Sequence, residues 1–249
     1  MKKYIFLLLF VLTIGNLSAQ TLVEQANEAY LASDYSKAAR LYEQAIQENG
    51  QSAAVYYNLG NAYFRLNKTA LSLLNYERAL LLDPSNKDIR ANLAFVQSKK
   101  TIDKIEPVDD FFLAEIFNNV RDLYSTNQWS RIAIACFLIF VGCLFLFFFS
   151  RRIVLKKIGF YAGLSFLILC LSANIFAYNQ KQKLTHRNTA IIFSPTTTLK
   201  SSPDNSGTDL FILHEGTKVT VKNKFGEWNE IETADGNVGW IKSTEIEII

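Results

Sequence analysis

The chain has 249 residues, of which 49% are hydrophobic and 13% aromatic, and its formal net charge at pH 7 is +3. This composition is rich for a soluble protein and predicts apolar segments that lie outside a globular core. Residues 184–249 contain six Lys or Arg against nine Asp or Glu, so this part of the chain offers no basic surface to nucleic acid.

Residues 1–19 have the pattern of a secretory signal peptide. Lys2 and Lys3 precede an apolar stretch of about 11 residues, which is within the usual length of a signal core and too short to span a bilayer. Ala19 is a small residue suited to cleavage before Gln20. An uncleaved anchor is the alternative. Lipidation is not expected, because no cysteine lies near the cleavage site.

Residues 20–100 contain two copies of one pattern, 34 residues apart. Its members are Ala26, Tyr42 and Ala45 in the first copy and Gly60, Tyr76 and Ala79 in the second. The second copy, which ends near Pro84, resembles the tetratricopeptide repeat family. That resemblance implies two antiparallel helices per repeat, crossing closely at the small residues. Residues 87–100 repeat only a first helix, and we expect this helix to cap the solenoid.

In repeats of this family the first helix of each hairpin lines a groove that binds partner proteins. The resemblance places these residues there: Asn27, Tyr30, Tyr57, Asn58, Asn61, Phe64, Arg65 and Asn92. Asparagine can donate to and accept from an extended peptide backbone. Val23 and Asp88 stand where a carboxylate clamp needs lysine, so we expect an internal peptide or a folded partner. The alternative is that the asparagines only cap and solvate helices.

Residues 101–130 combine a linker with a predicted amphipathic helix. Pro107, Asp109 and Asp110 mark the linker, and apolar residues then recur at roughly helical spacing. This helix could lie at a membrane surface and lead into the next segment. Packing on the last repeat helix is the alternative.

Two long apolar runs predict transmembrane helices at residues 131–150 and 158–178. Within them, residues 132–149 and 158–178 carry no charge, and each run is close to the roughly 20 residues needed to cross a bilayer. The loop at residues 151–157 contains Arg151, Arg152, Lys156 and Lys157, which predicts a cytoplasmic position. We therefore expect an inner (cytoplasmic) membrane protein whose repeats and C-terminal domain are periplasmic. Lys181, Lys183 and Arg187 weaken the charge contrast, and buried core helices are the alternative.

Nothing in the sequence predicts catalysis. Cys136, Cys143 and Cys170 all lie inside the proposed spans, no CxxC occurs, and the two histidines are isolated. Phosphate-binding glycine loops and the HExxH and GxSxG patterns are missing from the sequence. We therefore expect no enzyme, no metal site and no cofactor.

After a linker at residues 179–188, residues 189–249 read as a small all-β domain. Glycine and proline separate short β-branched and aromatic runs at residues 190–193, 210–213, 218–222, 228–232 and 239–241. The segments GEW at 226–228 and GWI at 239–241 resemble the bacterial SH3 domain family. Some of its members bind peptides or cell-wall components, which would put Trp228 and Trp240 on a recognition surface. Alternatively, these tryptophans complete a small core.

The order of signal peptide, helical repeats, two spans and SH3-like barrel predicts a multidomain membrane protein. This order resembles the BatE family of the Bacteroides aerotolerance operon. The resemblance implies a non-catalytic envelope scaffold in an aerotolerance or stress complex. Its implied partners are other Bat proteins, some with von Willebrand A domains, and a MoxR-type ATPase is associated with them. A peptidoglycan-binding anchor or sensor is the alternative function. Membrane lipid is a partner in either case, and nucleic acid is not.

Overall fold

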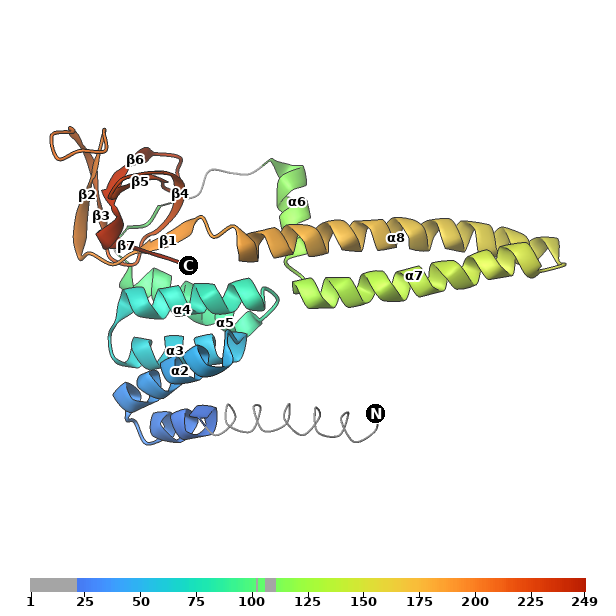
Figure 1. Ribbon diagram of the computed structural model, residues 1–249, viewed down its shortest axis with the longest axis horizontal. Coiled ribbons are helices and arrows are strands. Elements are labelled where there is room, and N and C mark those ends of the chain that lie inside the picture. The colour runs from blue at the N-terminus through green and yellow to red at the C-terminus, as the bar shows by residue number, and fades with distance from the viewer. Residues whose placement is uncertain (1–21, 102, 106–110) are drawn as a thin grey trace, which may run out of the picture. The chain divides into compact units, whose positions relative to one another are not determined.

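The computed structural model describes residues 22–101, 103–105 and 111–249. The predicted signal peptide at residues 1–19 lies outside these ranges, as does part of the predicted linker. The chain forms two compact units. One contains the N-terminal helices and a C-terminal sheet, and the other contains α6 (Phe112–Arg121), α7 (Thr126–Phe149) and α8 (Ile153–Thr185) (Figure 1).

Helical hairpins form the N-terminal part of the first unit. Helical residues 22–31 precede α2 (Tyr35–Asn49), and α3 (Ala53–Arg65) precedes α4 (Thr69–Leu82). The turn inside each hairpin contains a residue with positive φ, Ser33 at 64° and Asn67 at 55°. These two residues are 34 positions apart, so the backbone repeats with the same period as the sequence. The last helix of this part is α5 (Lys87–Lys100), whose N-terminus is capped by the Asn86 side chain.

The small residues of the pattern lie where the helices pack most closely. Ala26, Ala45 and Ala79 are buried, and a Cβ atom added to Gly60 would lie 2.7 Å from Cδ1 of Tyr76. Tyr42 and Tyr76 fill the space beside them, and each is 1% exposed. The expected role of these positions, close helix approach with aromatic filling, is the one that the structure has.

The C-terminal part of the first unit is a seven-stranded antiparallel sheet in the order β3-β2-β6-β5-β4-β1-β7. The strands are β1 (Thr189–Ile192), β2 (Thr196–Lys200), β3 (Asp209–His214), β4 (Lys218–Phe225), β5 (Trp228–Glu232), β6 (Val238–Lys242) and β7 (Ile246–Ile248). Five of these strands overlap the predicted runs. The sequence analysis did not include β2 and β7.

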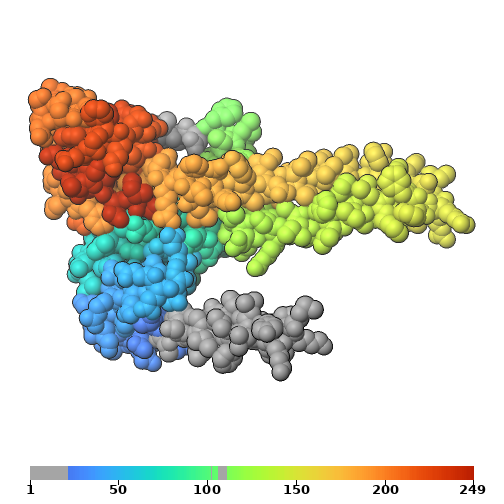
Figure 2. Space-filling model, in the orientation of Figure 1, coloured from blue at the N-terminus to red at the C-terminus, as the bar shows by residue number. Residues whose placement is uncertain are grey.

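The sheet packs on the helical repeats. Ile191 and the C-terminal Ile249 belong to one buried cluster with Leu73 of α4 and with Ile89 and Val96 of α5. In the space-filling view, the teal surface of α4 lies directly against the orange and red surface of the sheet (Figure 2). The sequence assigned the cap of the solenoid to α5 alone, whereas in the structure the sheet also covers the last repeat.

The second unit is built on an antiparallel pair of helices, α7 and α8, which run side by side (Figure 1). Gly159 makes their close approach possible, because a Cβ atom there would lie 2.8 Å from the carbonyl oxygen of Cys143. Both helices are long and apolar enough to cross a membrane, and only 11% and 22% of their most apolar windows are buried. A soluble core helix would be mostly buried. Both helices also extend beyond the predicted runs, since α7 begins at Thr126 and α8 ends at Thr185.

Candidate functional site

A repeated hydrogen-bond network lies on the first helices of the hairpins. The side-chain oxygen of Asn27 accepts from the Tyr42 hydroxyl at 2.5 Å and from the Asn58 amide at 3.4 Å. The oxygen of Asn61 accepts from the Tyr76 hydroxyl at 2.6 Å and from the Asn92 amide at 2.9 Å. The second set is the first shifted by 34 residues. In both sets the asparagine oxygen is used inside the protein.

The amide nitrogens of the same two asparagines remain available. Among the residues that the structure describes, neither Nδ2 of Asn27 nor Nδ2 of Asn61 has a hydrogen-bond partner. Fixing the oxygen also fixes the orientation of the amide plane, so each nitrogen is held as a donor. The result is a pair of oriented donors, one per repeat.

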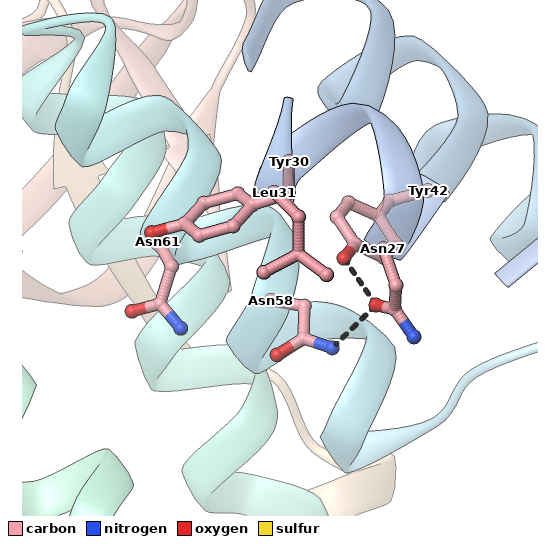
Figure 3. Close-up of a pocket in the computed structure, with 6 residues that line it drawn as sticks. All are labelled: Asn27, Tyr30, Leu31, Tyr42, Asn58 and Asn61. Atoms are coloured by element: carbon pink, nitrogen blue, oxygen red, sulfur yellow. Dashed lines mark hydrogen bonds between the residues drawn. The ribbon is translucent and has the colours of Figure 1, made fainter. Parts of the chain in front are cut away.

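A cavity of about 280 Å³ opens at this network. It is lined by Asn27, Tyr30, Leu31, Tyr42, Asn58 and Asn61 (Figure 3). Leu31 projects at the cavity with 83% of its surface exposed, although it is a large apolar side chain. Polar donors therefore lie next to an exposed apolar contact, as a site for a polypeptide segment requires.

The other predicted groove residues extend or flank this cavity. The Tyr57 hydroxyl accepts from the Asn92 amide at 3.0 Å, which joins both residues to the Asn61 set. Phe64 packs edge to face against Phe95, which is 52% exposed. The guanidinium of Arg65 stacks on the Tyr35 ring at 4.7 Å, so its charge is already engaged.

Burial keeps the tyrosines of the network uncharged. It raises the pKa of Tyr42 to about 12, and it also raises the pKa of Tyr76 and of Tyr30, in the last case against the opposing effect of Arg65. Their hydroxyls therefore remain donors at any physiological pH. The cavity is lined by neutral groups and suits an uncharged stretch of main chain.

Sequence reasoning did not include Tyr42 among the site residues, because it treated this tyrosine as packing only. The signal was present in the 34-residue equivalence with Tyr76, since both hydroxyls lie the same distance along the chain from a groove asparagine.

The two tryptophans of the sheet lie on its outward face. In β5 and β6, Ile231 and Ile241 are fully buried on one face, and strand alternation puts Trp228 and Trp240 on the other. Both rings are half-buried, and the Lys242 ammonium lies 5.6 Å from the centre of the Trp228 ring. Of the two expected roles, core completion does not agree with this placement.

The chain was then compared with known proteins. Residues 53–86, which form α3, α4 and their turns, match the tetratricopeptide repeat family. This segment is a tetratricopeptide repeat. A solved structure that the chain resembles is the Sgt2 TPR domain from Aspergillus fumigatus, with 14% sequence identity, coverage of 68% of this chain and 80% of that chain, and a TM-score of 0.31. The comparison with curated proteins gave no match. The repeat accounts for α3 and α4, and such repeats are protein-interaction modules.

Chemistry other than binding has no support in the described residues. They include no group of three or more His, Cys, Asp or Glu side chains that could hold a metal ion. The three cysteines are unpaired thiols on α7 and α8.

Proposed function

We propose that this protein is a non-catalytic, membrane-anchored scaffold whose repeat groove binds an extended segment of a partner protein. The observation that carries the proposal is the duplicated network in which Asn27 and Asn61 each keep an oriented amide donor toward the groove. Donors repeated at the spacing of the hairpins fit carbonyl oxygens repeated along an extended main chain.

The groove surface favours an uncharged internal segment. Its tyrosines are neutral, Arg65 is engaged with Tyr35, and the exposed side chains beside the donors are apolar, namely Leu31 and Phe95. A terminal carboxylate would need a free cation, which Val23 and Asp88 do not supply. The segment bound there should carry apolar side chains that contact Leu31 and Phe95.

Membrane anchoring is supported by α7 and α8, by their exposed apolar surfaces and by the four positive charges of the loop between them. With that loop in the cytoplasm, the repeats and the sheet are periplasmic. The order of repeats, spans and a small β domain supports a role in a Bat-type aerotolerance or stress complex of the envelope. Other Bat proteins with von Willebrand A domains are then the partners that we propose.

The test is co-purification from gently solubilised membranes with Leu31→Asp. Leu31 contributes an exposed side chain, so its replacement introduces a charge into the groove without removing a core contact, whereas Asn61→Ala would also break the bonds to Tyr76 and Asn92. The matched control is Ile212→Asp, which puts the same charge at a 55% exposed apolar position on β3.

We expect envelope membrane proteins to be recovered with the native chain and with Ile212→Asp, and to be lost with Leu31→Asp. Equal recovery with both variants would remove the groove from the proposal. Loss with both would mean that the sheet surface participates in the contact.

A second candidate function, binding of peptidoglycan, is favoured by the outward position of Trp228 and Trp240, because exposed aromatic faces can stack on sugars and peptides. It predicts that the detergent-solubilised full chain sediments with purified wall material and that Trp240→Ala abolishes this, while Leu31→Asp does not. A chain that remains in the supernatant argues against wall binding.

A further inference from the structure

Helix α6 has an apolar face that the rest of its unit covers only in part. Its apolar side chains occupy one side of the helix, and its polar side chains Glu115, Asn118 and Asn119 occupy the other. The apolar side chains are Phe112, Leu113, Ile116, Phe117 and Val120. This division describes an amphipathic helix with more apolar surface than one neighbour can bury.

One half of that face packs inside the unit. The Phe117 ring lies 5.2 Å from the Phe176 ring of α8, and Val120 contacts the buried cluster of Trp129 and Ala173. The other half is open. Phe112, Leu113 and Ile116 are 68%, 62% and 44% exposed, and Phe111 just before the helix is 74% exposed. Contiguous exposed apolar side chains of this size mark an interaction surface.

The position of α6 is fixed at the end of the apolar run of α8. Phe176 lies two residues before the end of the uncharged stretch 158–178. The indole nitrogen of Trp129 donates to the Arg121 carbonyl at 2.9 Å, and the Lys183 ammonium pairs with the Asp122 carboxylate at 3.2 Å. These contacts hold the end of α6 where the apolar surface of α7 and α8 gives way to charged residues.

Two further observations indicate what covers the open half. Figure 1 shows α6 running across α8 and not along it, as a helix in the plane of a bilayer would run beside a helix that spans it. Tyr124 and Tyr178, which are 42% and 63% exposed, occur at the same end of the helix pair. Tyrosine and tryptophan are enriched at membrane–water interfaces.

We propose that α6 lies in the membrane interface and inserts Phe112, Leu113 and Ile116 among the lipid acyl chains, with Asn119 and Glu115 facing water. The inference rests on the proposed anchoring through α7 and α8. Its partner is a phospholipid bilayer, and no anionic headgroup is required, because Arg121 and Lys183 are both engaged with Asp122. The helix would fix the height and tilt of the spans relative to the membrane surface.

The experiment uses the full chain in phosphatidylcholine vesicles, with Cys136, Cys143 and Cys170 replaced by alanine. Single cysteines are introduced by Phe112→Cys, Ile116→Cys or Asn119→Cys in α6, and by Leu138→Cys at a 65% exposed position in α7. Each is labelled with the same environment-sensitive fluorophore. Quenching by doxyl-labelled lipid reports contact with acyl chains, and quenching by iodide reports contact with water.

We expect lipid quenching with iodide protection at positions 112, 116 and 138, and the opposite at 119. If position 138 is quenched by lipid while 112 and 116 are open to iodide, the anchoring stands and the inference about α6 is wrong. If 112 and 116 are protected from both quenchers, protein covers this face and the inference is equally wrong. If position 138 is not quenched by lipid, the anchoring itself fails, and the proposal for α6 fails with it.

Discussion

At the scale of single residues, Asp103 ties the segment after α5 to the sheet. One carboxylate oxygen accepts from the His214 backbone amide and from the Thr217 hydroxyl, both at 2.7 Å, and the other lies 2.7 Å from Nδ1 of His214. Burial by itself would raise the pKa of Asp103, but the hydrogen bonds from Thr217 and His214 outweigh it and lower the pKa below its ordinary value of 3.8.

Asp103→Asn should therefore destabilise the first unit. An amide cannot accept all of these bonds, and we expect the free energy of unfolding to fall by about 1–3 kcal/mol at neutral pH. Because the folded-state pKa is depressed, the stabilisation by Asp103 is complete above pH 3.8 and is lost as the pH falls through the lower folded value. The difference between native and variant chains should shrink over that range in urea unfolding curves. Glu227→Gln, at an exposed position, is the control.

At the scale of helices and strands, Gly60 decides how closely α3 and α4 approach. A Cβ atom at this position would lie 2.7 and 2.8 Å from two ring carbons of Tyr76, and both residues are buried. Gly60→Ala should cost about 1–3 kcal/mol from overpacking, despite the better helix propensity of alanine. If the Tyr76 ring is the cause, the double variant with Tyr76→Leu will be less destabilised than the sum of the single variants in thermal unfolding. Additive effects would place the strain elsewhere.

Local pattern predicted the helices of the repeat and their small contact residues, since a period of 34 residues is visible in the sequence itself. It did not predict β2. In this strand Leu199 is fully buried, but the other buried position is Thr197, whose hydroxyl donates to the Glu245 carboxylate at 2.5 Å. A polar residue that is buried only because a distant carboxylate accepts its proton has no local signal. Strand β7 is three residues long and depends on pairing with β1.

The tryptophans show the converse case, in which the information was present but its weight was misjudged. Alternation along residues 228–232 and 239–241 already puts Trp228 and Trp240 opposite to Ile231 and Ile241. The groove asparagines were similarly readable in position. Their internal acceptor role was not, because it depends on Tyr42 and Tyr76 hydroxyls that reach them across a hairpin.

At the scale of the first unit, the docking of the sheet on the repeats lay beyond any sequence pattern. It depends on residue pairs far apart in the chain: Lys218 donates to the buried Glu77 carboxylate at 2.7 Å, and Arg78 donates to the Ile248 carbonyl at 2.7 Å. Glu215 accepts from the Ala70 amide at the start of α4. The consequence is that the last repeat and the sheet should unfold together, although each has its own core.

The ion pair between Glu77 and Lys218 offers the sharpest test of that coupling. Glu77 is only 7% exposed at its side chain, so Lys218→Glu would place two carboxylates together at a buried site and should weaken docking by about 2 kcal/mol, less than for a fully buried pair because Lys218 is 41% exposed. In a Trp129→Phe background, the remaining tryptophans, Trp228 and Trp240, report the sheet by fluorescence, while circular dichroism reports the helices. Lys218→Glu should shift the fluorescence transition in urea below that of the repeats.

The reversed pair, Glu77→Lys with Lys218→Glu, should bring the two transitions back toward each other, because the attraction is restored even though the buried site now holds a lysine. If the double variant separates the transitions as much as Lys218→Glu alone, the charges do not hold the sheet to α4. The apolar contacts of Ile191 and Ile249 would then carry the docking by themselves.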